Sequence, residues 1–339
     1  MRIQEVADRL GTTARAIRLY EQRGLLQPVK DAGSGYRRFT EPDMHRLQTI
    51  VALRELGLSL DAIAGLFAVG GQPGEWAELL QAARASLYRQ HLAAAQGLQA
   101  LDQVIAALER AGEVPLQEMQ DAARHLRVSR MLRESWQDRW DYDRLARRMD
   151  EGKASMPLAF TAGLSDALYE HTLETIAAVV APMPGEQGLD LGTGVGNLAW
   201  RLAASGAEVI GVEQSIGMLK MCRQRHPQLS VRQGNLLSLP FADQTADFIT
   251  CSFAMHHLTT EQQQLALQEV GRVLKPQGRL CLAGLALTDE HKSYNGDQSP
   301  PWYPLSEPHF MAWCTARSFS FDKHLLDQSV LVLGANLMS

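Results

Sequence analysis

Cysteine and long apolar runs are both scarce in this 339-residue sequence. The four cysteines all follow position 221 and are widely spaced, at Cys222, Cys251, Cys281 and Cys314. This spacing does not match a metal-binding cluster, so we expect buried thiols and no metal site. No apolar run approaches the roughly 20 residues that cross a bilayer, and the first residues contain no hydrophobic signal region. We therefore expect a cytoplasmic protein without a membrane span.

The length and the distribution of charge indicate more than one domain. A chain of 339 residues with 45% hydrophobic content is long enough for about two globular domains, each with its own core. Residues 1–58 contain 10 Lys and Arg against 7 Asp and Glu, whereas the remaining residues contain 23 against 31. A basic end on an acidic chain favours phosphate binding at that end alone.

The first residues of the chain predict two short helices joined by a tight turn. Val6 and Leu10 lie on one helix face, Gly11 can end that helix in a left-handed conformation, and Thr12 or Thr13 can cap the next. The second helix would present two arginines to solvent, Arg15 and Arg18. This is a helix-turn-helix, whose second helix enters the major groove of DNA.

A basic hairpin follows, with Gly33–Gly35 at its tip, and it predicts a wing. The runs IRLYEQRGLL (17–26), GYRRF (35–39) and ELGLSLDAI (55–63) resemble the MerR family of transcriptional regulators. The resemblance implies that the first 72 residues bind double-stranded promoter DNA. The residues implied in contact with DNA are Arg15, Arg18, Tyr20, Tyr36, Arg37 and Arg38. The alternative is that these cations form only a solvated surface.

Residues 75–111 contain little Gly or Pro and predict one long helix. A row of apolar residues recurs every seven positions, at Leu80, Leu87, Ala94, Leu101 and Leu108. Leu98 and Ile105 fill part of a companion row. The MerR resemblance implies an antiparallel coiled-coil homodimer through residues 73–112, and the alternative is a helix packed on its own domain. Residues 106–115 contain no cysteine, so a thiolate metal sensor is not expected.

A glycine-rich turn marks a second domain. An apolar segment beginning at Gly188 runs into Gly192-Thr-Gly-Val-Gly196, and a further strand ends at Glu213, 21 residues after Gly192. Glycines let a backbone approach a ligand closely, and a carboxylate at that spacing can accept hydrogen bonds from both ribose hydroxyls.

The order of the following segments is similar to class I S-adenosylmethionine-dependent methyltransferases, most closely the small-molecule group that includes ubiquinone- and biotin-pathway enzymes. The resemblance implies a Rossmann-like α/β domain with a seven-stranded sheet over residues 181–339, preceded by a linker and cap helices over 113–180. It implies S-adenosylmethionine as the cofactor. The residues implied in its binding are Asp190, Gly192, Thr193, Gly194, Gly196, Glu213, Gln214, Ser215, Met218, Asn235, Leu236 and Cys251. Relatives usually carry Asp at the position of Asn235.

The residues that would act on the methyl acceptor are less determined. His256 and His257 follow the fourth strand and are the candidates for a general base or a substrate ligand, although they could equally cap the next helix. The aromatic side chains of Trp136, Trp140 and Tyr142, and others in an insert at 291–313, could cover the site and favour an apolar or planar substrate.

Two hypotheses for the function follow. In the first, a MerR-type regulator has an effector domain that methylates a small molecule, and in the second that domain is catalytically idle and senses S-adenosylmethionine or another ligand. Neither the methyl acceptor nor the operator can be read from the sequence.

Overall fold

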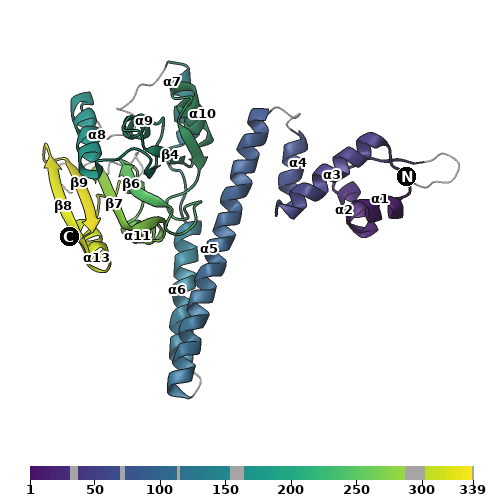
Figure 1. The fold of residues 1–339 in the computed structure, drawn as a ribbon, viewed down its shortest axis with the longest axis horizontal. Coiled ribbons are helices and arrows are strands. Elements are labelled where there is room, and N and C mark those ends of the chain that lie inside the picture. The colour runs from purple at the N-terminus through teal and green to yellow at the C-terminus, as the bar shows by residue number, and fades with distance from the viewer. Residues whose placement is uncertain (31–36, 69–72, 113–114, 153–163, 287–301, 338–339) are drawn as a thin grey trace. The chain divides into compact units, whose positions relative to one another are not determined.

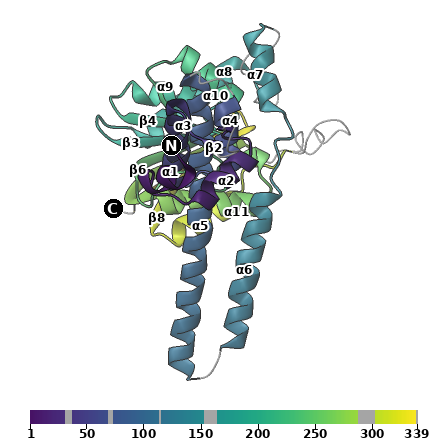
Figure 2. The same cartoon turned by 90° about the vertical axis from the view of Figure 1, so that its right-hand side faces the viewer.

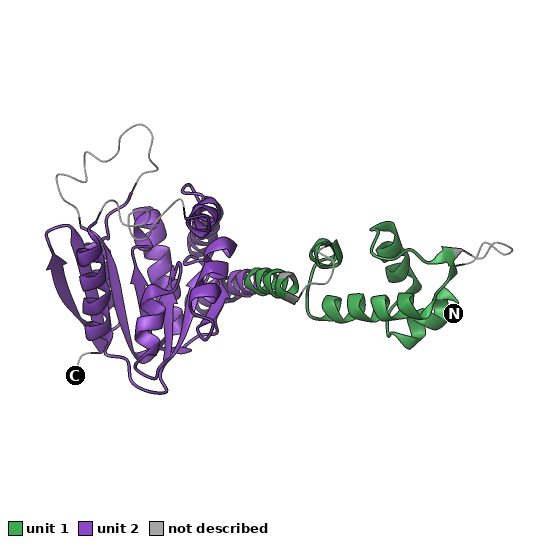
Figure 3. Ribbon diagram, turned by 90° about the horizontal axis from the view of Figure 1, so that it is seen from above, with its two compact units in different colours: residues 1–87 green, residues 88–339 purple. Residues whose placement is uncertain are grey.

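The computed structural model describes residues 1–30, 37–68, 73–112, 115–152, 164–286 and 302–337 (Figure 1). The chain divides into two compact units, Met1–Leu87 and Tyr88–Ser339 (Figure 3). The boundary falls inside one helix, α5 (Pro73–Ala111). In the part of the chain that the structure describes, no helix has the length and apolar character of a membrane span.

The first unit is a helix-turn-helix followed by a wing and two more helices. Besides the start of α5 it contains α1 (Ile3–Arg9), α2 (Ala14–Gln22), β1 (Val29–Lys30), β2 (Arg37–Arg38), α3 (Glu41–Glu55) and α4 (Leu60–Ala68).

The turn between α1 and α2 has the conformation that the sequence predicts. Gly11 has φ of +62°. Thr13 caps α2, because its hydroxyl accepts a hydrogen bond from the backbone N–H of Ala16 at 3.1 Å. The wing strands β1 and β2 pair in antiparallel register, with Val29 opposite Arg38. The wing tip, including Tyr36, lies outside the described residues.

The second unit is built on a seven-stranded sheet in the order β5-β4-β3-β6-β7-β9-β8. The first five strands in that order are parallel, and β9 and β8 join antiparallel at the edge. The seven-stranded Rossmann-like sheet expected from the sequence is therefore confirmed. The strands are β3 (Gln187–Leu191), β4 (Glu208–Glu213), β5 (Ser230–Gln233), β6 (Ala246–Ser252), β7 (Leu274–Leu285), β8 (Phe319–Leu326) and β9 (Val330–Leu337).

Helices cover both faces of this sheet. Side chains of α8 (Asp166–Val180), α9 (Asn197–Ala203) and α10 (Ile216–Arg225) share one buried cluster with strand residues such as Phe248. The opposite face packs against α11 (Thr260–Val273), α13 (Glu307–Thr315) and the C-terminal end of α6 (Leu116–Glu134). The strands that follow β3 are added first on one side of it, as β4 and β5, and then on the other, as β6 and β7. In doubly wound folds, ligands bind in the crevice at the carboxyl ends of the strands where this order switches.

The second unit begins with an antiparallel helical hairpin. Residues 88–111 of α5 and all of α6 run alongside each other (Figures 1 and 2). The row of apolar side chains predicted on α5 is exposed here, with Leu98 63%, Leu101 58%, Ile105 50% and Leu108 42% exposed. Four exposed apolar side chains on one helix face are what a partner helix would cover.

Candidate functional site

A half-buried carboxylate, that of Glu213, organises the crevice at the end of the sheet. Glu213 is the last residue of β4, and its Oε2 accepts a hydrogen bond from the Gly194 N–H at 3.1 Å. Its Oε1 accepts from the backbone N–H groups of Gln214 at 2.7 Å and Ser215 at 2.9 Å. Burial raises the pKa of Glu213, and these three donors act in the opposite direction. The carboxylate thereby joins the turn after β3 to the turn after β4.

The glycine turn needs its glycines for space as well as for conformation. Gly192 has φ of +69°, and a Cβ at this position would lie 2.4 Å from Cβ of Ala254. Gly194 has φ of +56° and places its N–H toward Glu213. The turn is also tied to β4, since Gly192 and Thr193 both donate backbone hydrogen bonds to the carbonyl of Val212, at 2.8 and 3.0 Å.

A second carboxylate lies beneath the turn. Asp190 is 1% exposed and accepts hydrogen bonds from the hydroxyls of Thr193 at 2.7 Å and Thr250 at 3.0 Å. Burial raises its pKa to about 6, although the threonine hydroxyls favour the ionised form. Asp190 therefore supports the loop from below and does not line the crevice.

The crevice contains a cavity of about 230 Å³, and its wall includes eight of the residues implied in cofactor binding. These eight are Gly192, Thr193, Gly194, Glu213, Gln214, Ser215, Asn235 and Leu236.

The other four implied cofactor residues lie away from the cavity wall. Asp190 supports the turn, and Gly196 caps α9 with φ of +92°. Met218 is fully buried in a cluster of side chains from α7 (Tyr142–Asp150) and α10, and Cys251 is buried in the core, so neither side chain lines the cavity. Their part in cofactor binding stays a prediction. Ser252, which neighbours Cys251 at the end of β6, lines the cavity, because successive strand residues face opposite sides of a sheet.

Cap residues complete the cavity wall. Trp136 and Tyr142, expected as part of an aromatic cover, line it together with Asp138 and Asp143. Asp143 also holds the turn after β4, since its Oδ1 accepts from the Ser215 hydroxyl at 2.6 Å and from the Gly217 N–H at 2.8 Å. The role of Asp143 could not be found from the sequence, because it depends on a contact spanning 72 residues.

The two histidines differ in position. His257 lines the cavity, and its Nε2 is 2.5 Å from the hydroxyl of Tyr142. His256 is 0% exposed and stacks on Trp302 with ring centroids 4.4 Å apart. Burial lowers the pKa of His257 to about 3 and that of His256 well below its usual value. Both rings are therefore neutral near pH 7, which is the form that can accept a proton, but so low a pKa makes each ring a weak base. His256 packs behind the site.

The basic residues of the first unit form a separate surface. Arg15, Arg18 and Arg38 are exposed, while Arg37 forms an ion pair with Glu21 at 2.6 Å. Tyr20 is only 6% exposed and packs in the core of this unit, so its side chain is not available for the DNA contact expected from the sequence.

Family models match both parts of the chain. Residues 1–69 match the model of the MerR HTH family regulatory protein, and residues 189–282 match that of a methyltransferase domain. The chain joins a MerR-type helix-turn-helix domain to a methyltransferase domain. The cavity lies in the unit that contains the methyltransferase domain, and several of its lining residues precede the matched range.

Curated relatives match the methyltransferase domain. A demethylmenaquinone methyltransferase from Streptomyces griseus is 36% identical over 107 residues, which cover 32% of this chain and 46% of that protein. Another, from Beutenbergia cavernae, is 31% identical over 164 residues, covering 48% of this chain and 59% of the relative. The chain thus spans about half the length of the curated relatives it matches.

Among solved structures, magnesium protoporphyrin IX methyltransferase from Synechocystis with bound S-adenosylhomocysteine is 21% identical. The match has a TM-score of 0.44 and covers 51% of this chain and 84% of that one.

Because of the raised pKa of Asp190, we expect the free energy of unfolding to depend on pH. The Asp190 pKa of about 6 in the folded protein lies above the usual aspartate value of 3.8, so the stability that Asp190 contributes is fully present below pH 3.8 and is lost as the pH rises through 6. Between pH 5 and 7.5, the ligand-free wild type should lose about 1.4 kcal/mol of unfolding free energy relative to Asp190→Asn. Urea unfolding of both proteins across this range measures the difference, and parallel pH profiles would contradict it.

Proposed function

We propose that this protein is a DNA-binding regulator whose methyltransferase domain binds S-adenosylmethionine and methylates a small molecule. The observation that carries the proposal is the arrangement of Glu213 beside the glycine turn. A carboxylate offers about four lone-pair sites, and backbone N–H groups occupy three of them. The remaining site can accept a hydrogen bond from one ribose hydroxyl of the cofactor.

The neighbouring groups suit the remaining parts of that cofactor. The turn at Gly192–Gly194 would face its amino-acid end, and Asn235 and Leu236 would face the adenine. Asp143, through Ser215, would hold the adenine side in place. Bound S-adenosylmethionine supplies an electrophilic methyl group, so the protein needs mainly to align the acceptor and exclude water.

The acceptor in this proposal is an uncharged apolar or planar molecule. Four aromatic side chains line the cavity, Trp136, Tyr142, Tyr169 and Phe253, whereas the described lining includes no Lys or Arg. An anionic acceptor would find carboxylates and no cation there. His257, neutral and in contact with the Tyr142 hydroxyl through Nε2, would hold the Tyr142 ring in the cavity wall, and its low pKa would make it a weak base toward the acceptor.

The DNA-binding part of the proposal requires a dimer. Arg15 and Arg18 project from α2, which would enter the major groove, and Arg38 would contact phosphate from the wing. The exposed apolar row on α5 would pair with the same row of a second copy. A two-fold protein would then read a two-fold operator.

Glu213→Ala tests the cofactor site. Wild type should bind S-adenosylhomocysteine with micromolar affinity, about −8 kcal/mol. The variant should lose this binding in calorimetric titration, because it lacks the carboxylate that would accept the hydrogen bond from the ribose. The matched control is Glu208→Ala, at the other end of β4, where the carboxylate accepts from the side chain of Gln187. Retained binding by Glu213→Ala would refute this assignment.

A turnover assay on the wild-type protein distinguishes an active methyltransferase from a catalytically idle sensor. S-adenosylhomocysteine release in the presence of phenolic, thiol and carboxylic acceptors measures turnover. We expect turnover with a phenolic or other uncharged planar acceptor, and cofactor binding without turnover on any acceptor would support the sensor.

Arg18→Ala tests DNA recognition. The change should weaken binding to a fragment carrying the protein's own promoter by about 1–3 kcal/mol, roughly fivefold to 160-fold, because a groove contact is lost. Fluorescence anisotropy measures the loss. Arg124→Ala, on exposed α6, removes the same charge away from α2 and should bind DNA as wild type does. An unchanged affinity in Arg18→Ala would count against the proposed interface.

Leu101→Lys tests the dimer. Each copy would lose a buried leucine worth roughly 1.5–3 kcal/mol, so dimerisation should weaken about a hundredfold or more. Sedimentation equilibrium measures this, with Gln99→Lys, almost opposite on the helix, as the control that remains dimeric. A Leu101→Lys protein as dimeric as the control would exclude this face.

A further inference from the structure

The loop after β5 connects the cofactor cavity to the helical hairpin. Asn235 lines the cavity, and its Oδ1 accepts a hydrogen bond from the backbone N–H of Leu237 at 2.7 Å. Its Nδ2 donates to the side chain of Gln214, which lies in the turn after Glu213. A ligand that contacts Asn235 therefore acts on the backbone of residues 235–237 as well as on the turn after β4.

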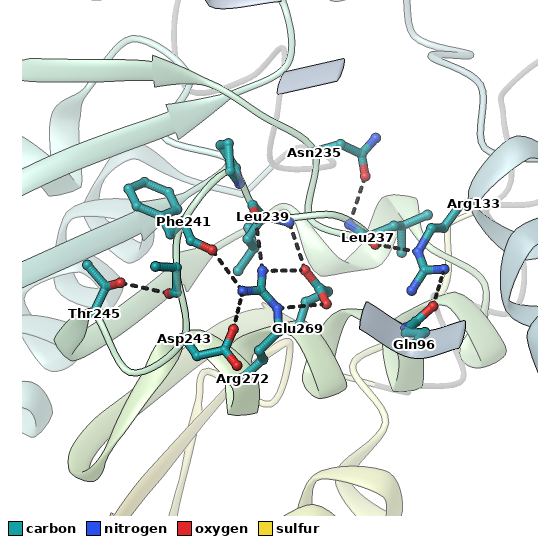
Figure 4. A network of polar contacts seen from close by, with 12 residues as sticks. Gln96, Arg133, Asn235, Leu237, Leu239, Phe241, Asp243, Thr245, Glu269 and Arg272 are labelled. Atoms are coloured by element: carbon teal, nitrogen blue, oxygen red, sulfur yellow. Dashed lines mark hydrogen bonds and ion pairs between the residues drawn. The ribbon is translucent and has the colours of Figure 1, made fainter. Parts of the chain in front are cut away.

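Arg133, near the end of α6, reaches this loop from outside the cavity (Figure 4). Its Nε donates to the carbonyl of Leu237 at 3.0 Å, and its Nη1 donates to Oε1 of Gln96 on α5, also at 3.0 Å. One guanidinium thus joins the cavity wall to both helices of the hairpin. The group is planar, so its two bonds cannot adjust independently when either acceptor moves.

The environment of the Arg133 guanidinium disfavours its charged form. Burial lowers the pKa of Arg133, and Glu269 partly offsets this. Nη2 is buried without a hydrogen-bond partner among the residues that the structure describes. Hydrogen bonds from a charged donor are stronger than those between neutral groups, so the position of Arg133 depends strongly on its two acceptors.

The far end of the loop is fixed more firmly. Leu239 donates its backbone N–H to Glu269 at 3.0 Å, and its carbonyl accepts from Arg272 at 3.0 Å (Figure 4). Glu269 and Arg272 also form an ion pair at 2.9 Å. Because Leu239 is clamped, a displacement that starts at Asn235 would be taken up at Leu237, where Arg133 binds.

We propose that Arg133 is a positioning residue that transmits occupancy of the adenine end of the cavity to α5 through Gln96. The inference rests on the proposed function, because Asn235 meets a ligand only if the domain binds the cofactor. Since α5 continues into the first unit, its stability is a property that both ends of the chain can influence. The ligand changes the stability of α5 by as much as it changes the free energy of the two Arg133 hydrogen bonds.

Hydrogen–deuterium exchange on the full-length protein, with and without S-adenosylhomocysteine, tests this route. In wild type, ligand should slow amide exchange in residues 232–240, 130–136 and 92–100, the last by about fivefold. In Gln96→Leu, which removes the acceptor but keeps the helix, the first two responses should remain and the response of 92–100 should disappear. Gln99→Leu makes the same change on the same helix and should respond as wild type does.

The outcomes are distinguishable. An equal response of residues 92–100 in Gln96→Leu would overturn the route through Gln96. Slowed exchange at 232–240 with no response of α5 in wild type would overturn the coupling itself. Failure of the wild type to bind S-adenosylhomocysteine, measured separately by calorimetry, would overturn the proposed cofactor site and this inference with it.

Discussion

The Glu213 carboxylate, with its three backbone donors, is the interaction on which the site depends. A buried carboxylate without partners would be strongly destabilising, and the N–H groups of Gly194, Gln214 and Ser215 offset that cost. These groups can reach one carboxylate only if the turns after β3 and β4 take the conformations observed. Compensation of this carboxylate thus holds the two turns that line the crevice in a fixed arrangement.

The segment between the hairpin and the sheet forms part of this crevice. Trp136, Tyr142 and Asp143 all line the cavity, and Asp143 fixes the start of α10. The residues that link the helical hairpin to the sheet thus also line the proposed ligand site. A movement of this segment would change the cavity wall, and this is a physical route by which one part of the chain could affect the other.

Local features were predictable from the sequence, whereas long-range contacts were not. The cap at Thr13, the left-handed Gly11 and the glycine turn with its strand-end Glu213 follow from residue types at fixed spacing. Tyr20 was misjudged because a motif shows which residues recur but not which helix face is buried. Asp143 and the Arg133–Gln96 bond depend on tertiary contacts between distant segments, for which the sequence carries no periodic signal.

If the helical hairpin couples the ligand site to DNA binding, thermodynamic linkage requires that each binding event affect the other. A ligand that stabilises one arrangement of α5 changes DNA affinity by some factor, and operator binding must then change ligand affinity by the same factor. This equality applies to binding affinities only. If the domain also converts its ligand to product, the rate of turnover is a kinetic quantity, and its change on DNA binding need not equal the change in DNA affinity. Promoter binding could therefore alter methyl transfer without a matching effect of turnover on DNA affinity. The two hydrogen bonds of Arg133, to Leu237 and to Gln96, lie within one unit. The coupling therefore requires a change in the strength of these two bonds and no movement of the sheet.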